Sequence, residues 1–315
     1  MRYLFDFLIF FILFSCCWWF RIIYLSIKKQ PEIKTKKARF FLLAVIILIF
    51  VVVIYGSFVE PQLIKTTKIP ITLSPSQNKA TIKIAFLTDW HLGYFKGPFF
   101  ANRIVNLVKN EKPDLILLGG DFLDRKRKPE DTIFPLQKIS LLIPTFAVMG
   151  NHEYNTGGIN DEDFEDRTKE LRQFFFKNKI KVLDNGCETI SLKNKKINIA
   201  GIIDLWTGKA DLRKAYETCD PRQKTVLLAH NPDVILSPPA EKFDLILSGH
   251  THNGQVRLPF IGSIYPIPTE LGRKFGQGLF QLKNNQLYIS SGIGEGGTRA
   301  RLFNRPELTI IELTY

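Results

Sequence analysis

The sequence predicts an α/β domain preceded by two apolar helices. Two long apolar runs lie within the first 60 of the 315 residues, and short apolar runs recur from residue 81 onward with helical patterns between several of them. Buried strands that alternate with helices are typical of an α/β fold. The roughly 235 residues that follow residue 80 suit one domain with a large core.

Residues 1 to 60 are expected to form a membrane anchor. Residues 40 to 59 carry no charge, and a helix that rises 1.5 Å per residue needs about this length to cross a hydrocarbon core of roughly 30 Å. A second apolar run, at about residues 4 to 25, is the other predicted transmembrane helix. A cleaved signal peptide is the competing interpretation of that run, although no small-residue cleavage signal follows it and Trp18 and Trp19 resemble interfacial anchors.

The loop between the two runs predicts the orientation of the protein. Its only acid is Glu32. The basic residues in and beside the loop are Arg21, Lys28, Lys29, Lys34, Lys36, Lys37 and Arg39. Because Lys and Arg concentrate in cytoplasmic loops, we expect both flanking segments outside. The sequence therefore predicts a multi-pass protein of the cell membrane with an extracytoplasmic C-terminal domain.

The net charge of +13 does not indicate a nucleic-acid partner. Ten Lys and Arg against three acids in the first seventy residues account for +7, and the remaining +6 is spread over the large domain. No motif of a nucleic-acid-binding module occurs. The charge favours anionic lipid headgroups or a phosphorylated small-molecule or lipid substrate. No feature of the sequence indicates an oligomeric state.

Cys187 and Cys219 are the only thiols of the predicted domain. Outside the cell they could pair, but their spacing leaves open whether they lie close together. No Cys-x-x-Cys spacing is present, which argues against a thiolate zinc site.

Five predicted strands each end in a polar cluster. They cover residues 81–87, 115–118, 145–149, 225–229 and 243–247, with helices expected at 100–109, at 131–142 and, after an acidic loop from residue 160, up to 176. Shorter strands are expected at 181–183, 189–192 and 197–201. Ligands of open α/β sheets bind beyond the carboxyl ends of strands, so the five clusters are expected to converge on one site. All five histidines of the chain lie in these clusters.

The converging side chains offer oxygen and nitrogen donors. They are Asp89, His91, Asp121, Asn151, His230, His250 and His252, with His152 and Glu153 beside them. Mixed imidazole and carboxylate donors suit Mn, Fe or Zn better than Ca. Seven donors are too many for one tetrahedral ion, whereas two ions about 3.5–4 Å apart that share a carboxylate would use them all. Such a pair activates water and stabilises in-line displacement at phosphorus.

The motifs D-x-H, GGD, GNHE, LAHNP and GHTHNGQ occur in this order. This series resembles the calcineurin-like metallophosphoesterase superfamily. It is most similar to a membrane-anchored bacterial branch whose tail motif has the form R-x-x-x-x-P-E, here Arg301 to Glu307. The resemblance covers the chain from Lys83 onward. It implies a four-layer α/β/β/α sandwich over residues 81–315, joined by a linker over 61–80 to the transmembrane hairpin.

The same resemblance implies a role for each donor. Asp89, His91 and His252 would hold one divalent ion, Asn151, His230 and His250 the other, and Asp121 would bridge them. His152 would stabilise the phosphoryl charge or protonate the leaving oxygen, oriented by Glu153 or Asp124. Trp90 and Asn253 depart from the common pattern without removing a donor.

The implied activity is metal-dependent hydrolysis of phosphate esters, including phosphodiesters, through a metal-bound hydroxide. Two alternatives stay open: a pyrophosphatase that acts on UDP-2,3-diacylglucosamine, which requires a cytoplasmic domain, and a catalytically silent membrane scaffold. The cluster Arg125, Lys126, Arg127 and Lys128 is read as a solvated loop or a phosphate-binding patch. Gly292 to Gly297 is expected to be a turn.

Overall fold

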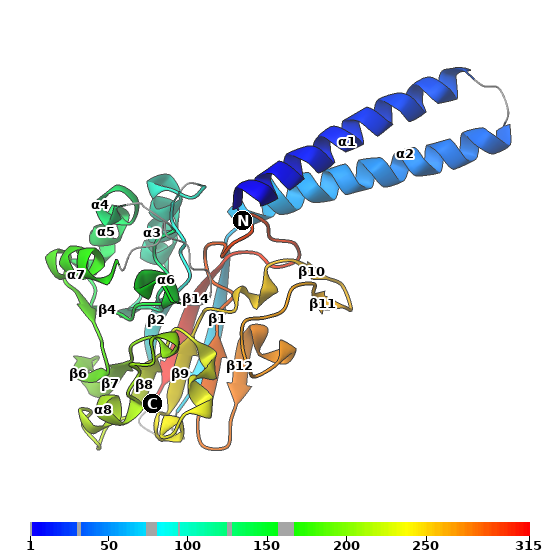
Figure 1. Ribbon diagram of the computed structural model, residues 1–315. Coiled ribbons are helices and arrows are strands. Elements are labelled where there is room, and N and C mark those ends of the chain that lie inside the picture. Colours follow the sequence, from blue (N-terminus) through cyan, green and yellow to red (C-terminus); the bar gives the residue numbers. More distant parts are fainter. Residues whose placement is uncertain (1, 30–32, 74–80, 94, 125–127, 157–166) are drawn as a thin grey trace.

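The computed structural model describes residues 2–29, 33–73, 81–93, 95–124, 128–156 and 167–315, and it contains two six-stranded mixed sheets (Figure 1). The first sheet has the order β1 Lys65–Thr72, β14 Glu307–Thr314, β2 Thr81–Leu87, β3 Leu115–Leu118, β4 Thr145–Ala147 and β5 Ile180–Val182. The second has the order β12 Gly278–Gln281, β13 Gln286–Ile289, β9 Leu245–Ser248, β8 Thr225–Leu228, β7 Lys195–Gly201 and β6 Gly186–Leu192. The α/β prediction is confirmed, and each predicted strand that precedes a polar cluster is present.

The two sheets face each other across a shared apolar core. Strand β3 shows how the sequence achieves this, because successive side chains of a strand point to opposite faces. Leu115 and Leu117 point into the core between the sheets. Ile116 and Leu118 point outward into a core covered by helices. A third core lies on the outer face of the second sheet, against α8 Leu212–Glu217. A strand buried on both faces needs the continuous apolar run that the sequence shows.

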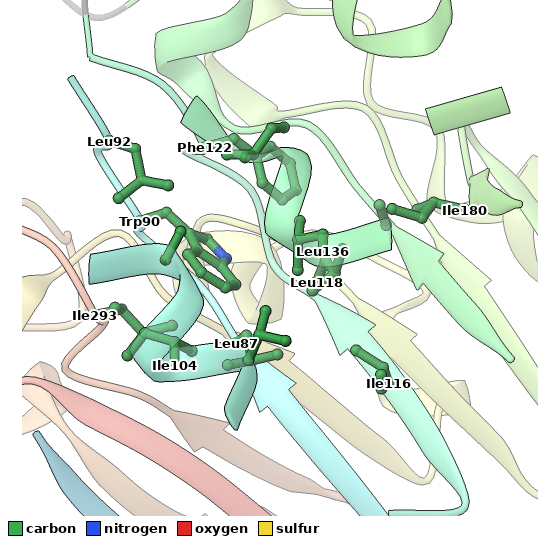
Figure 2. Packing of buried hydrophobic residues seen from close by; sticks show 14 of the residues in the cluster. Leu87, Trp90, Leu92, Ile104, Ile116, Leu118, Phe122, Leu136, Ile180 and Ile293 are labelled. Atoms are coloured by element: carbon green, nitrogen blue, oxygen red, sulfur yellow. The ribbon is translucent and has the colours of Figure 1, made fainter. Parts of the chain in front are cut away.

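The outer core of the first sheet holds the segment that follows β2 in place. Trp90 is fully buried and, with Leu87, Ile104 and Ile293, belongs to this cluster (Figure 2). Ile104 comes from α3 Pro98–Glu111, which begins with proline in its first turn, a position where the missing amide hydrogen costs nothing. The indole therefore anchors the backbone between Asp89 and His91 on the side opposite the polar cluster.

The helix predicted at 131–142 is wrong as one element. The chain instead forms α4 Pro129–Thr132, a 3-10 turn Phe134–Leu136 and α5 Gln137–Ser140. Pro135 explains the break, because proline lacks the amide hydrogen and its ring clashes with the preceding turn of an α-helix. The later prediction is confirmed as α7 Thr168–Lys177. The basic residues Arg125, Lys126 and Arg127 and the acidic loop at 157–166 lie outside the described residues.

The segment predicted as a linker contains strand β1. Residues 65 to 72 pair in parallel with the whole of β14, from Lys65 opposite Glu307 to Thr72 opposite Thr314. The sequence hides this strand because it is rich in Thr and Lys and contains Pro70, which an edge strand tolerates on its unpaired side. Strand β14, at the other end of the chain, was not predicted either.

Two N-terminal helices project from the domain as a pair (Figure 1). They are α1 Arg2–Lys29 and α2 Ile33–Ile54, and α2 continues through a π-helical turn, Tyr55–Val59, into a 3-10 turn, Glu60–Gln62. Both are long and apolar enough to cross a membrane. Their large apolar side chains are largely exposed, as Phe41 at 73% shows.

Cys187 and Cys219 form a disulfide, which answers the question that the spacing left open. Cys187 lies in β6 and Cys219 follows α8. The bond closes a stretch of 32 residues and ties the edge of the second sheet to the helix that covers it. Constraining a loop of this length in the unfolded chain is worth about 3 to 4 kcal/mol in the chain-entropy estimate.

A chain that begins at residue 81, the predicted domain boundary, should be less stable than one that begins at residue 55. The shorter chain lacks β1, so the edge of β14 is left unpaired. We expect its melting midpoint to lie at least about 5 °C lower, since 1 kcal/mol shifts a domain of this size by roughly 2–4 °C. Thermal melts of both purified chains measure this. Equal midpoints would show that β1 is dispensable.

Candidate metal centre

The predicted donors meet beyond the carboxyl ends of the parallel strands of the two sheets, where the two sheets face each other. Asp89, Asp121 and Asn151 follow β2, β3 and β4 of the first sheet, and His230 and His250 follow β8 and β9 of the second. His91 and His252 belong to the same loops as Asp89 and His250. All seven donor side chains are buried. The structure therefore brings together every donor that the sequence analysis named.

Asp89, His91 and His252 form the first group. Their nearest ligand atoms lie within 4.8 Å of one another. The Nε2 atoms of His91 and His252 are 3.1 Å apart, and His252 Nε2 is 3.5 Å from Oδ1 of Asp89. Thr88 supports the group, because its hydroxyl donates to Oδ2 of Asp89.

Asn151, His230 and His250 form the second group. The amide oxygen of Asn151 lies 3.1 Å from Nε2 of His230 and 3.0 Å from Nδ1 of His250. The other ring nitrogen of His230 lies 2.8 Å from the carbonyl oxygen of Gly119, a contact that fixes the orientation of the ring. Orienting contacts of this kind are usual for metal-binding histidines.

Asp121 lies between the two groups. Its Oδ2 is 3.4 Å from Nε2 of His91 and 3.2 Å from Nε2 of His230, so one carboxylate oxygen faces a histidine from each group. Its Oδ1 accepts a hydrogen bond from the backbone amide of His152. Burial opposes ionisation of this carboxyl, but His230 and His152 outweigh it and hold its pKa well below the usual range.

The electrostatics of the site favour bound cations. Burial lowers the pKa of His250 to about 3 and that of His252 well below its ordinary value, so both rings are neutral and offer a lone pair. Burial also disfavours the charged form of His230, yet the negative charge of Asp121 raises its pKa well above the usual range. A proton on His230 thus balances the negative charge of Asp121, as a bound divalent cation would.

Most of the donors have a strained backbone conformation. Five of the seven have a positive φ, a conformation that non-glycine residues rarely adopt and that clusters at functional sites. They are Asp89, His91, Asp121, His250 and His252. Two glycines leave room for the carboxylates: a Cβ on Gly150 would lie 2.2 Å from Oδ1 of Asp121, and one on Gly249 would lie 2.1 Å from Oδ2 of Asp89.

His152 is the most accessible of the five histidines. Its side chain is 26% exposed, and its Nε2 lies 4.0 Å from Oδ2 of Asp121. The ring packs edge-on against His91, with centroids 4.6 Å apart. A substrate that approaches the donors from solvent would therefore meet this imidazole.

Of the two residues expected to orient His152, Glu153 is the wrong one, and orientation by Asp124 stays a prediction. The carboxylate of Glu153 is buried and accepts hydrogen bonds from the backbone amides of Gly150, Asp121 and Phe122 at 2.8 to 2.9 Å. It stabilises the turn that carries Asp121 rather than the imidazole. The motif G-N-H-E thus combines a donor, an accessible histidine and a backbone support in consecutive positions.

The structure adds supporting residues from the end of the chain. The side chain of Asn304 donates to the carbonyl oxygen of His252 at 2.7 Å. Its backbone amide and that of Phe303 donate to the carboxylate of Glu60, which is 2% exposed. Glu60 lies in the last turn after α2. No short-range pattern links residues 244 positions apart, so the sequence analysis missed this connection.

Arg301 organises the glycine-containing loop behind the site. Its guanidinium is fully buried and donates to the carbonyl oxygens of Ser291, Gly292 and Gly294. It also donates to Glu295, which accepts a second bond from the buried ammonium of Lys96. Burial lowers the pKa of Lys96 to about 8. The backbone amide of Gly294 donates to the carbonyl oxygen of Asp89, so the turn expected at 292–297 supports a donor.

Trp206 is a second residue that the sequence analysis missed. Its ring is 42% exposed and lies edge-on against His250, with centroids 4.5 Å apart. It follows β7, a sixth strand whose carboxyl end reaches the site. The sequence does contain a signal for this residue, because Asp204 and Trp206 interrupt the apolar run after that strand.

The donor set fits a pair of divalent cations. Each group supplies three oxygen or nitrogen atoms, and Asp121 is shared between the groups. Several donors approach one another closely in a buried space, a costly arrangement unless it is compensated by charge of the opposite sign. The clusters are consistent with a dinuclear metal site, and the donor types leave the identity of the metal open.

Comparisons with known proteins show what the chain is similar to. The family model described as calcineurin-like phosphoesterase matches residues 82–254. The chain is 34% identical over 238 residues to phosphodiesterase YaeI of Escherichia coli, covering 75% of this chain and 83% of YaeI. It is 29% identical over 265 residues to the uncharacterized metallophosphoesterase YkuE of Bacillus subtilis, covering 82% and 88%. It is 31% identical over 262 residues to a transmembrane protein with metallophosphoesterase domain of Bos taurus, covering 79% and 56%.

Replacing Asn304 by alanine should weaken metal binding without removing a donor. The substitution frees the loop of His252, and loss of a residue that orients a ligand typically costs about 10- to 100-fold in metal affinity. Calorimetric titration of the full chain with Mn²⁺ measures the change. Asn284→Ala, in the exposed turn between β12 and β13, is the control. An unchanged affinity in Asn304→Ala would mean that the loop keeps its position unaided.

Proposed function

Because the chain belongs to the calcineurin-like phosphoesterase family, we propose that it is a membrane-anchored phosphodiesterase with two metal ions in its active site. The observation that carries the proposal is the carboxylate of Asp121, which faces a histidine from each donor group. A metal-dependent phosphoesterase with a His and Asp site is the activity that the family and this cluster support together.

We assign the seven donors to two ions. Asp89, His91 and His252 would hold the first, Asn151, His230 and His250 would hold the second, and Asp121 would be shared between them. Asp89, His91 and His252 approach one another closely, and the amide oxygen of Asn151 lies near ring nitrogens of both His230 and His250, which supports this division. Manganese, iron and zinc all accept such a mixed set of nitrogen and oxygen donors.

The ions would supply Lewis acidity and positive charge for the attack of water on phosphorus. The protein side chains supply the rest. His152, the most accessible histidine, donates a hydrogen bond or a proton to the departing oxygen. Trp206 offers an exposed aromatic face beside His250 for the organic part of the substrate. The name of the YaeI relative supports a phosphodiester as the substrate class.

Three observations support the membrane anchor and an extracytoplasmic domain. In the most apolar stretch of each N-terminal helix, only 17% of the residues in the first helix and 11% in the second are buried. A core helix of a soluble protein is mostly buried. The loop between them is basic, a property of cytoplasmic loops. The disulfide between Cys187 and Cys219 suits an oxidising compartment. The cytoplasmic site needed for a nucleotide-linked sugar has no such support.

Variants at Asp121 and His152 should separate metal binding from proton transfer. Asp121→Ala is expected to lose metal, because both donor groups lose their shared ligand. His152→Ala is expected to keep its metal and to lose about 10²- to 10⁴-fold in rate, the usual contribution of a general acid. Metal content by mass spectrometry and turnover of bis(p-nitrophenyl) phosphate with Mn²⁺ measure the two effects. Parental metal content in Asp121→Ala would refute the bridge.

Fusions at the C terminus should report the side of the membrane. Alkaline phosphatase fused after Tyr315 is expected to be active, because that enzyme needs the disulfides of an oxidising compartment. A fluorescent protein that folds only in the cytoplasm, fused at the same place, should stay dark. The opposite pair of results would place the domain in the cytoplasm and revive the nucleotide-sugar substrate.

A further inference from the structure

An apolar hairpin protrudes from the domain shortly after the histidine loop. Strands β10 Arg257–Leu258 and β11 Gly262–Ser263 pair antiparallel around a tip of Pro259, Phe260 and Ile261. We call residues 258–265 the apolar hairpin. Its exposed side chains are Leu258 at 37%, Phe260 at 110%, Ile261 at 66%, Ile264 at 46% and Tyr265 at 43%.

The conformation and the composition of the hairpin indicate that its exposed apolar side chains form an interaction surface. Phe260 has a φ of 66°, a strained conformation for a bulky residue, and the turn presents its ring fully to the outside. From residue 255 to residue 269 the chain has no acid and a single basic residue, Arg257. A contiguous exposed apolar patch of this kind marks an interaction surface.

The position of the hairpin, beside the end of the N-terminal helices, indicates the membrane as its partner. The backbone amide of Arg257 donates to the carbonyl oxygen of Leu302, and the amide of Phe303 donates to Glu60 after α2. One segment therefore contacts both the base of the hairpin and the end of the anchor. Phe303 is itself 64% exposed and lines the same surface hollow as Phe260. In Figure 1 the loop that carries β10 and β11 lies on the side of the domain from which α1 and α2 project.

The segment that follows α2 also exposes apolar side chains. Val59 is 40% exposed and Leu63 is 39% exposed. Beside them the guanidinium of Arg305 donates to the carbonyl oxygen of Leu63. Aromatic and aliphatic side chains next to basic ones, without acids in the hairpin, suit the interface of a bilayer that contains anionic lipids.

We propose that the apolar hairpin is a second membrane contact, which inserts into the surface of the bilayer that α2 crosses. The proposal rests on the proposed anchoring of α1 and α2. Phe260 is eight residues from His252, so an extended chain limits their separation to about 29 Å. Insertion of the hairpin holds the metal centre close to the membrane surface.

Spin labels in the full-length protein can test this contact. Cys16→Ser and Cys17→Ser remove the free thiols, and Cys187 and Cys219 remain bonded. A label is then introduced at Phe260→Cys, and the protein is placed in nanodiscs of phosphatidylcholine and phosphatidylglycerol. Collision with oxygen, which concentrates in lipid, is compared with collision with a water-soluble nickel chelate.

Two further labels serve as references. Phe176→Cys, in α7, is the matched control because Phe176 is another phenylalanine with high exposure, 86%. Leu48→Cys, in α2, reports on the anchor. We expect the label at 260 to collide more often with oxygen than with nickel, as at 48, and the label at 176 to show the reverse order.

Three results would overturn the proposal. Equal behaviour of the labels at 260 and 176, with lipid contact at 48, would place the hairpin in water while leaving the anchor intact. Water contact at 48 as well would overturn the anchoring together with the hairpin contact. Low collision with both reagents and spin–spin broadening at 260 would show that a second copy of the chain covers the hairpin.

Discussion

The site depends on one buried carboxylate, that of Asp121, which faces histidines contributed by both sheets. A buried charge is tolerated only where opposite charge or hydrogen bonds compensate it. The apolar core between the sheets fixes the separation of the two loops that provide this compensation. The core and the site therefore have opposite effects on the stability of the fold. Apolar burial stabilises it, whereas the buried charge and the positive-φ donors cost free energy that a bound cation would offset.

The central strands and their donors could be predicted because their signals are local. Each is a short apolar run followed at once by a polar cluster, as with Leu115 to Leu118 before Asp121. The grouping of the donors was less local and came from the family resemblance, and the assignment of each donor to an ion stays a prediction. The predicted helix at 131–142 is wrong because the apolar pattern continues past Pro135, whereas the proline interrupts the helix.

Features that depend on distant pairings could not be predicted. Strand β1 is a polar edge segment, and only its partner β14, over 200 residues away, makes it a strand. Asn304 and Glu60 are ordinary polar residues until the fold brings them to His252. Trp206 is intermediate, because it follows a predicted strand but offers no donor, and a search for metal ligands passes over it.

The tail motif R-x-x-x-x-P-E supports the site through hydrogen bonds to the backbone of the turn at Ser291. Arg301 binds the carbonyl oxygen of Ser291, and Glu307 accepts the amide of the same residue, so both ends of the motif hold one turn. That turn continues to Gly292, where an added Cβ would lie 2.6 Å from Cβ of Asp89. The backbone amide of Arg301 also donates to the carbonyl oxygen of Gly56, in the π-helical turn that follows α2. The N-terminal helices and a donor loop thus share one hydrogen-bonded support, which links the residues after α2 to the backbone beside Asp89.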